Sequence, residues 1–328
     1  MLTAIWQKDD FREREWVTQM FGSLISEHIA DGSNSIVMDD CLLIDQYLHT
    51  KRGEYYRAFR SHRNAFLLHL SDEQFHGGYE AYANFTGVFR NYWSAIFNPA
   101  SVKILPLGYA NGLARRVEPK LASERQYLWS FAGESSRASR PEMVAALKGI
   151  SPHLFCATDK KGTVALAADT YRELLEDTVF APCPMGRLNL ECFRLYEALE
   201  SGAIPIVERR ATLDYFTKLL GPNPIMEIRS WAGARDKIRS LAADPARLNQ
   251  IQREISSWWD VHKQTVKNNI SHFVISRIDS ATSDASAVKW IYNLPCWQLI
   301  ELARHHSGPA MIRRFGIQTT RLIGGLHN

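Results

Sequence analysis

The segment from Thr178 to Glu208 contains the residues whose types and spacing could bind an anionic substrate. A short apolar stretch, Thr178 to Ala181, runs into a loop of proline and glycine. The loop leads into a helical pattern with Asn189 at the N-cap position. The first N–H groups of a helix have no partner within the helix and carry a positive potential, so the sequence predicts a phosphate site here.

Apolar and charged residues occupy opposite sides of this expected helix. At about 100° per residue, the apolar stripe consists of Cys192, Leu195, Tyr196 and Leu199. The other side carries Glu191, Arg194 and Glu197. Because Arg194 lies in the first half of the helix, its cation opposes the helix dipole unless an anion is nearby, which favours a diphosphate ligand. The alternative is a solvated face with ion pairs worth a few tenths of a kcal/mol each.

Strands and helices alternate around this segment, as in βαβ units. We expect strands at 127–132, 153–158, 178–181 and 204–207, and helices at 140–148, 167–176 and 189–201, with further helical sequence over 231–278. Such alternation predicts a parallel sheet covered on both faces, a Rossmann-like domain. Ligands of open α/β sheets lie beyond the carboxyl ends of the strands, so the loop after Ala181 is the expected site. Pro205 is tolerated only at an edge or at a strand start.

The first hundred residues predict a second α/β region with less regular signals. We expect a helix at 10–30, a strand at 35–38 ending at Asp39 and Asp40, and strands at 65–70 and 102–107, while 88–97 is ambiguous. Two glycines, Gly108 and Gly112, then break the chain. The expected domains are 1–112, 113–280 and a helical extension at 281–328.

Composition excludes several classes of protein. A chain of 328 residues favours two domains, and a net charge of +4 is too small to indicate nucleic-acid binding. The chain has no Gly-x-Gly-x-x-Gly turn, which argues against an NAD-dependent oxidoreductase. Five scattered cysteines fit neither a disulfide framework nor a zinc site and indicate a reducing compartment. With no signal peptide and no apolar run of membrane-spanning length, we expect a cytoplasmic protein.

The C-terminal tail has the only concentrated positive charge. After Glu301 there is no acidic residue, and the tail arginines Arg304, Arg313, Arg314 and Arg321 alternate with apolar residues. This pattern suits contact with the anionic inner face of a membrane. The alternative is a terminal helix packed on the protein.

The run TVFAPCPMGRLNLECFRLYEALESGAIPIVE resembles the donor-binding motif of exostosin-type glycosyltransferases, most of all their ribitol-phosphate xylosyltransferase branch. Supporting stretches are LPLGYANGL at 105–113 and SFAGESSRASR at 130–140. Similar but weaker patterns occur in α-1,3-fucosyltransferases. The resemblance implies a GT-B fold, with two Rossmann-like domains facing an interdomain cleft and the C-terminal domain binding a nucleotide sugar.

The resemblance also assigns roles to residues. It implies that Glu197 accepts hydrogen bonds from the ribose and that Arg194 neutralises the diphosphate. The remaining donor-binding positions that it implies are Gly133, Ser139, Arg140, Gly186, Asn189 and Glu191, with Arg140 as a second phosphate contact. For Ser139 and Arg140 the alternative is a glycine turn followed by a capped helix.

The chemistry expected from this resemblance is inverting transfer without a metal. The chain has no Asp-x-Asp motif, so the leaving-group charge must be met by the helix N-terminus and arginine, and no cofactor is expected. Inversion implies one displacement in which a base takes the proton of the acceptor hydroxyl. Asp72 and Glu73, directly after a buried strand, are the candidates, with His69 and His76 as alternatives.

The expected substrates are a UDP-sugar, UDP-xylose first, and a glycan or polyol-phosphate acceptor. Two other functions remain open at this point. One is a GDP-fucose-type transferase, and the other is a non-catalytic scaffold that binds a sugar nucleotide.

Overall fold

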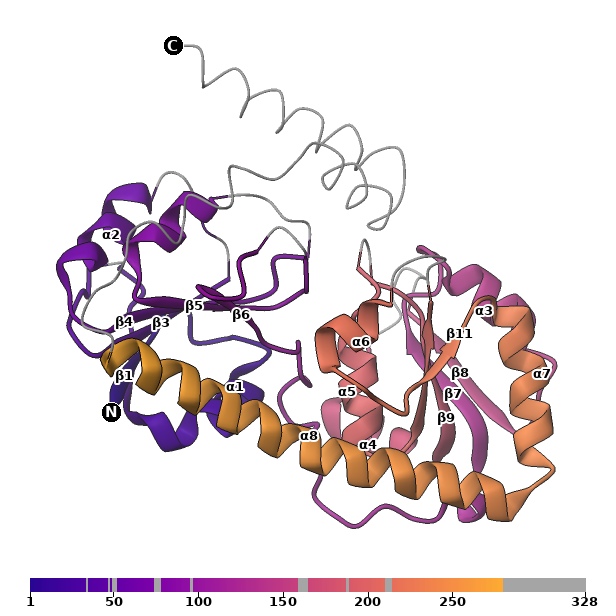
Figure 1. Cartoon of the computed structure of the whole chain (residues 1–328). Helices are drawn as coiled ribbons and strands as arrows, with labels where there is room; N and C mark the ends of the chain where they lie inside the picture. The colour runs from indigo at the N-terminus through magenta and orange to yellow at the C-terminus, as the bar shows by residue number, and fades with distance from the viewer. Residues whose placement is uncertain are drawn as a thin grey trace. The chain divides into compact units, whose positions relative to one another are not determined.

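The protein folds into two compact units, each built on one parallel sheet (Figure 1). The computed structural model describes residues 1–33, 35–46, 48, 52–73, 78–94, 97–158, 165–186, 189–209 and 214–279. Unit 1 comprises Met1–Asp9, Ser23–Leu105 and the described residues from Ile270 onward. Unit 2 comprises Asp10–Gly22 and Pro106–Asn269.

The sheet of unit 1 has six parallel strands in the order β2-β1-β3-β4-β5-β6. The strands are β1 (Leu2–Trp6), β2 (Ile25–Ala30), β3 (Cys41–Asp45), β4 (Ala65–His69), β5 (Gly87–Arg90) and β6 (Val102–Ile104). Every residue of β3, β4 and β5 is buried, as expected for parallel strands that are covered on both faces. The helix α2 (Gly53–Ala58) connects β3 to β4.

The sheet of unit 2 has five parallel strands in the order β11-β10-β9-β7-β8. The strands are β7 (Tyr127–Gly133), β8 (His153–Ala157), β9 (Thr178–Cys183), β10 (Ile204–Glu208) and β11 (Met226–Ile228). Because β7 lies between β8 and β9, the strand order reverses beside β7. This switch point is where ligands bind in open α/β sheets.

Helices cover both faces of the unit 2 sheet. The helices α4 (Ala168–Glu176) and α5 (Phe193–Glu200) pack together on one face, while α3 (Arg140–Leu147) and α7 (Trp231–Ala242) pack together on the other (Figure 1). A short α6 (Tyr215–Leu220) precedes β11. The predicted Rossmann-like domain in this half of the chain is confirmed.

Two helices belong to units that the sequence order would not suggest. The helix α1 (Arg14–Phe21) lies in unit 2, where Trp16 is fully buried and its indole Nε1 donates to the carbonyl of Pro106 at 3.1 Å. Gly108, at φ 72°, makes room for this indole, because a Cβ there would lie 2.2 Å from Trp16. The long α8 (Pro245–Asp279) packs in unit 2 up to Asn269 and in unit 1 from Ile270.

Residues 106–112, which the sequence analysis assigned to the first domain, belong to unit 2, and so do residues 10–22. The contacts of Trp16 with Pro106 and Gly108 account for this difference. The expected helical extension at 281–328 and its basic tail lie outside the described residues.

Three expectations for the secondary structure are wrong. The helix expected over 10–30 ends at Phe21, and Ile25–Ala30 forms β2, an edge strand whose mostly exposed residues show no alternation. The strand expected at 35–38 is instead Cys41–Asp45, because Asp40, at φ 51°, turns the chain just before it. The helix expected from Asn189 begins at Phe193, with Cys192 in the N-cap position.

Pro205 is explained by its position at the start of a strand. It is the second residue of β10, and pairing with β11 begins one residue later at Ile206. Among the described helices, none combines the length and apolar character needed to cross a membrane.

Candidate functional site

The residues expected to bind a substrate gather at the carboxyl ends of β7, β9 and β10 in unit 2. Arg194 of α5 reaches the end of β7, where its Nη2 donates to the carbonyl of Ala132 at 3.0 Å. Its guanidinium carbon lies 4.6 Å from the centroid of the Phe131 ring. Gly133 has φ 141°, a conformation that favours glycine, and a Cβ there would lie 2.1 Å from Arg194 Nη2 and would displace that guanidinium.

Arg140 approaches the same place from the start of α3. Its Nη1 donates to the carbonyl of Glu134 at 2.9 Å and lies 3.9 Å from the carboxylate of that residue. Burial lowers the pKa of Arg140, and the neighbouring charge of Arg194 lowers it further. Burial also disfavours the charged form of Arg194, but Tyr171, Cys192 and Glu197 outweigh it and raise its pKa. The two cations therefore lie close enough for the charge of Arg194 to disfavour that of Arg140.

Both arginines keep an open donor. The Nε–H groups of Arg140 and Arg194 are buried and have no hydrogen-bond partner among the described residues. A buried donor without a partner costs roughly 1–3 kcal/mol, and more when the group is charged. An anion at this edge of the sheet would satisfy both donors and relieve the repulsion between the two cations.

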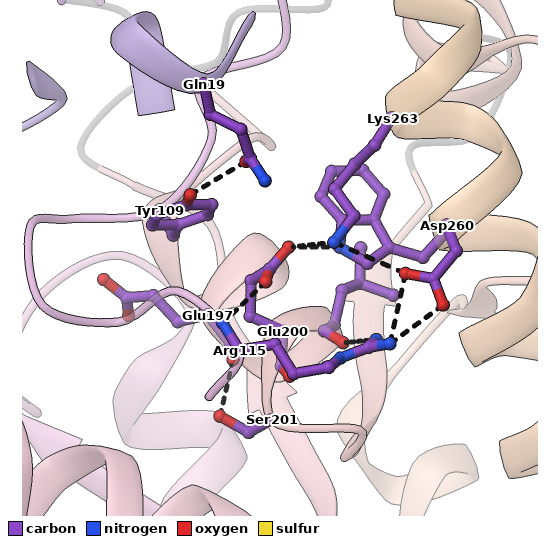
Figure 2. Close-up of polar contacts among 10 residues, drawn as sticks. Gln19, Tyr109, Arg115, Glu197, Glu200, Ser201, Asp260 and Lys263 are labelled. Carbon is purple, nitrogen blue, oxygen red and sulfur yellow. Dashed lines mark hydrogen bonds and ion pairs between the residues drawn. The ribbon is translucent and has the colours of Figure 1, made fainter. Parts of the chain in front are cut away.

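Glu197 lies on α5 close to the same arginine, and it is only 6% exposed. Burial raises its pKa, while Arg194, Arg12, the hydroxyl of Tyr171 and the backbone of Ala110 partly offset that rise. Its carboxylate points away from Glu200 (Figure 2). The ribose-binding role of Glu197 stays a prediction.

Glu191 is buried and engaged by the protein. Its Oε1 accepts hydrogen bonds from the backbone N–H of Leu107 at 2.6 Å and the hydroxyl of Tyr196 at 2.5 Å, and Oε2 accepts one from Tyr215 at 3.3 Å. Glu191 therefore ties two segments to the start of α5, namely α6 and the loop at residues 106–112, called the 107 loop. Because Glu191 and Glu197 are both buried, the alternative of a solvated helix face is wrong.

The predicted N-cap residue, Asn189, shapes the loop before α5. Its side chain accepts a hydrogen bond from the N–H of Glu191 at 3.2 Å, and its carbonyl accepts one from the N–H of Gly186 at 2.8 Å. The N–H of Gly186 is thus already used in closing the loop. Asn189 is fully buried.

The sequence analysis missed one residue of this region, Glu208 at the end of β10. Its Oε1 accepts hydrogen bonds from the hydroxyl of Ser139, from the N–H of Met185 at 3.2 Å and from the indole of Trp231 at 3.3 Å. It is the one acidic residue that ends the strand motif Ile-Pro-Ile-Val-Glu, and strand ends are where ligands bind in such sheets. That signal could have identified it.

A buried ionic network fixes the far end of α5 (Figure 2). Glu200, 1% exposed, accepts hydrogen bonds from Lys263 at 2.9 Å and from the indole of Trp259 at 2.7 Å. Arg115 donates to the last carbonyls of α5, Leu199 at 3.2 Å and Glu200 at 3.1 Å. It also pairs with Asp260 at 2.9 Å. These contacts join α5 to α8 and hold Arg194 in position.

In unit 1, the candidate bases follow β4 as expected. Asp72 is 2% exposed, accepts a hydrogen bond from Tyr79 at 2.9 Å and pairs with the fully buried Arg90 at 3.4 Å. Glu73 is half-buried. His69 is buried, with its Nδ1 2.7 Å from the hydroxyl of Tyr82, and His76 lies outside the described residues. Of the two carboxylates, Glu73 is the more accessible.

A second polar cluster in unit 1 lies at the ends of β1 and β3. Asp45 pairs with Arg52 at 2.6 Å and accepts a hydrogen bond from Tyr56 at 2.8 Å, and Arg52 also donates to Gln7 at 3.0 Å. The sequence analysis missed Asp45 because it placed the strand at 35–38. Over the residues that the structure covers, no three His, Cys, Asp or Glu side chains are grouped so that they could hold a metal ion.

Comparisons with known proteins match the part of the chain that contains the unit 2 sheet. The family model described as RXYLT1 C-terminal domain matches residues 112–278. The mouse protein Ribitol-5-phosphate xylosyltransferase 1 (Mus musculus) is 28% identical over 131 residues, which are 37% of this chain and 29% of that protein. The chain thus matches less than a third of the length of this relative.

Solved structures with the same fold are glycosyltransferases of the GT-B type. A crystal structure of alpha1,3-fucosyltransferase has a TM-score of 0.54 at 12% identity, covering 86% of this chain and 91% of that one. The DNA-modifying enzyme beta-glucosyltransferase has a TM-score of 0.50 at 9% identity, covering 84% and 100%. The predicted GT-B fold is confirmed. Because the sequence identities to these structures are so low, the matches establish the fold alone.

The network around Glu200 leads to a prediction for stability. Glu200→Ala should lower the free energy of unfolding by about 3–5 kcal/mol, because it leaves Lys263, only 13% exposed, without its buried anion. Chemical denaturation followed by tryptophan fluorescence measures this change. The matched control is Asp236→Ala, which removes the exposed ion pair with Arg235 and should cost at most about 1 kcal/mol. Equal losses in both variants would contradict the structural role of the network.

Proposed function

Because this chain belongs to the family of the RXYLT1 C-terminal domain, we propose that it is a glycosyltransferase that moves a sugar from a nucleotide-sugar donor to an acceptor hydroxyl. One observation carries the proposal. Arg140 and Arg194 converge at the switch point of the unit 2 sheet, and each keeps a buried Nε–H without a hydrogen-bond partner among the described residues. A diphosphate supplies the two negative groups that this arrangement lacks.

The same groups would act in the chemical step. When the bond from the sugar to the diphosphate breaks, negative charge grows on the leaving oxygen. The two guanidinium groups and the first turn of α5 stabilise that charge without rearranging, because the protein already holds them in place. The transfer inverts the anomeric centre in one displacement. A carboxylate of unit 1, Asp72 or Glu73, takes the proton of the acceptor hydroxyl.

The donor we propose is a UDP-sugar, UDP-xylose first, and the acceptor is a glycan or a polyol phosphate. The name of the mouse relative, a ribitol-5-phosphate xylosyltransferase, supports xylose as the sugar and a polyol phosphate as the acceptor. A GDP-sugar is the second candidate, since the fold is also that of an alpha1,3-fucosyltransferase. A thermal-shift panel of UDP-sugars and GDP-sugars separates the two, because a donor at 100 times its Kd adds about 2.7 kcal/mol of stability.

Removal of either arginine should weaken nucleotide binding through the diphosphate. Arg194→Ala and Arg140→Ala should raise the Kd for UDP or GDP about tenfold to a hundredfold and leave the Kd for the nucleoside nearly unchanged. Calorimetric titration of each variant with both nucleotides and both nucleosides measures the difference. Arg194→Ala should also lower kcat, because the activation free energy should rise by an amount on the order of 2–4 kcal/mol.

The control is Arg116→Ala, which removes an arginine that is 55% exposed and paired with Asp169. It should bind nucleotides as the wild type does. Arg140→Ala should also keep or raise the melting temperature, since it removes a charge that is repelled by Arg194. Normal diphosphate affinity in both Arg140→Ala and Arg194→Ala would place the donor elsewhere.

Transfer should not require a divalent cation. The chain lacks an Asp-x-Asp motif, and the proposed site meets the leaving-group charge with two arginines. The rate of sugar transfer should therefore be the same in excess EDTA as in magnesium or manganese. Complete loss of activity in EDTA, restored by manganese, would show that this part of the proposal is wrong.

The base can be assigned by two conservative variants. Glu73→Gln should abolish most turnover and leave donor affinity intact, because a base that acts on the acceptor does not touch the donor. Asp72→Asn should mainly lower stability, since it leaves the fully buried Arg90 without its charged partner. The measurements are kcat, donor Kd and melting temperature for each variant. If Asp72→Asn folds normally and alone loses turnover, Asp72 is the base, and normal kcat in both variants excludes the pair.

A further inference from the structure

Glu208 holds three separate segments of unit 2 with one oxygen. Its Oε1 accepts from Ser139 before α3, from the N–H of Met185 in the loop after β9, and from Trp231 at the start of α7. Trp231 is 1% exposed, so the indole fixes the carboxylate from the core side. The orientation of Glu208 is therefore set before any ligand binds.

The second oxygen of Glu208 is open. No described residue donates a hydrogen bond to Oε2, although the side chain is half-buried at the carboxyl edge of the sheet. A carboxylate oxygen can accept about two hydrogen bonds. Ser139 is the neighbour in sequence of Arg140, and Met185 is the neighbour of Gly186, so the open oxygen lies among the loops that carry the proposed donor contacts.

Charge restricts what this oxygen can bind. A carboxylate repels a phosphate, so the diphosphate itself is excluded as its ligand. An uncharged donor group, such as a hydroxyl or a nucleobase N–H, forms a charge-assisted hydrogen bond with it. Burial raises the pKa of Glu197, the carboxylate that the family resemblance assigned to the ribose, and Arg194 and Tyr171 partly offset that rise.

We infer that Glu208 is a recognition residue for the sugar nucleotide, whose Oε2 accepts a hydrogen bond from an uncharged O–H or N–H group of the donor. This inference rests on the proposed function, since it requires a nucleotide sugar at this edge of the sheet. On this inference, Glu208 binds an uncharged group of the donor, while the neighbouring arginines bind its diphosphate.

The test is calorimetric titration of Glu208→Gln with UDP-xylose, UDP, 2′-deoxy-UDP and GDP. The amide can keep its oxygen toward Ser139, Met185 and Trp231 and then presents an NH₂ group where Oε2 was. The Kd for UDP-xylose should rise about tenfold or more. If Glu208 accepts its hydrogen bond from the ribose 2′-hydroxyl, the substitution should not change the Kd for 2′-deoxy-UDP. If the group is on the transferred sugar, the substitution should not change the Kd for UDP, 2′-deoxy-UDP or GDP. If it is a base N–H or the ribose 3′-hydroxyl, the effect persists in 2′-deoxy-UDP.

A second variant separates the recognition of the donor by Glu208 from its structural role in joining three segments of unit 2. Trp231→Phe removes one of the three donors to Oε1 but keeps an aromatic ring and the open Oε2, so it should weaken binding of the four probes less than Glu208→Gln does. The surface control is Glu142→Gln, on the exposed side of α3. Should Glu208→Gln fail to fold, Glu208→Asp retracts the carboxylate by one methylene and should weaken the same probes.

Three outcomes would overturn the inference. Wild-type affinity of Glu208→Gln for all probes would do so, and so would an equal loss in Trp231→Phe, which would make loop tying the sole role of Glu208. If the wild type binds none of the four probes, the proposed function and this inference fall together. If Arg194→Ala weakens nucleotide binding and Glu208→Gln does not, only the inference fails.

Discussion

The placement of two cations beside each other, away from water, is the constraint on which the rest of unit 2 depends. Arg194 comes from α5 and Arg140 from α3, and burial together with the charge of Arg194 lowers the pKa of Arg140, so the position of α5 sets how strongly the two cations interact. The helix is held at both ends. Glu191 fixes its start to the 107 loop and α6, and Glu200 fixes its end to α8. The charged edge of the sheet is thus maintained by contacts away from it.

Those contacts come from parts of the chain that are distant in sequence. Unit 2 includes α1, whose Trp16 stacks on Trp259 of α8 at a centroid distance of 5.9 Å and bonds to Pro106. Tyr109 in the following loop donates to Gln19 of α1 at 2.8 Å (Figure 2). Without α1, the 107 loop would lose the indole that fills the space over Gly108. The site therefore depends on the N-terminal helix although no motif in that helix indicates it.

The sequence predicted the sheet of unit 2 better than that of unit 1, for a physical reason. Strands such as β7 and β9 are apolar runs bounded by turn residues, whereas β2 pairs on one side only and exposes most of its residues. The strand β3 was placed a few residues early because the Asp39–Asp40 turn precedes it, and Asp45 was missed with it. Within the site, the spacing of residues along the expected helix predicted which side chains lie on the same side of it. It could not show which charges the protein itself would neutralise, since the partners of Glu191 and Glu200 lie up to 84 and 85 residues away.

Burial also explains why the glutamates of α5 and Glu208 have different roles. Three glutamates lie on or just before α5, and all three are 6% exposed or less, because a helix packed against a sheet, a loop and a second helix leaves its carboxylates facing protein. Each must then be satisfied by protein donors, or its charged form becomes unfavourable, as the raised pKa of Glu197 shows. Glu208 ends a strand instead, and the donors to it among the described residues, Ser139, Met185 and Trp231, all reach Oε1. An acidic side chain at the carboxyl edge can be anchored through one oxygen and still present the other outward. Arg194 reaches the same edge from the helix because its side chain is long, and this is why the cationic contacts come from helices and the open carboxylate from a strand.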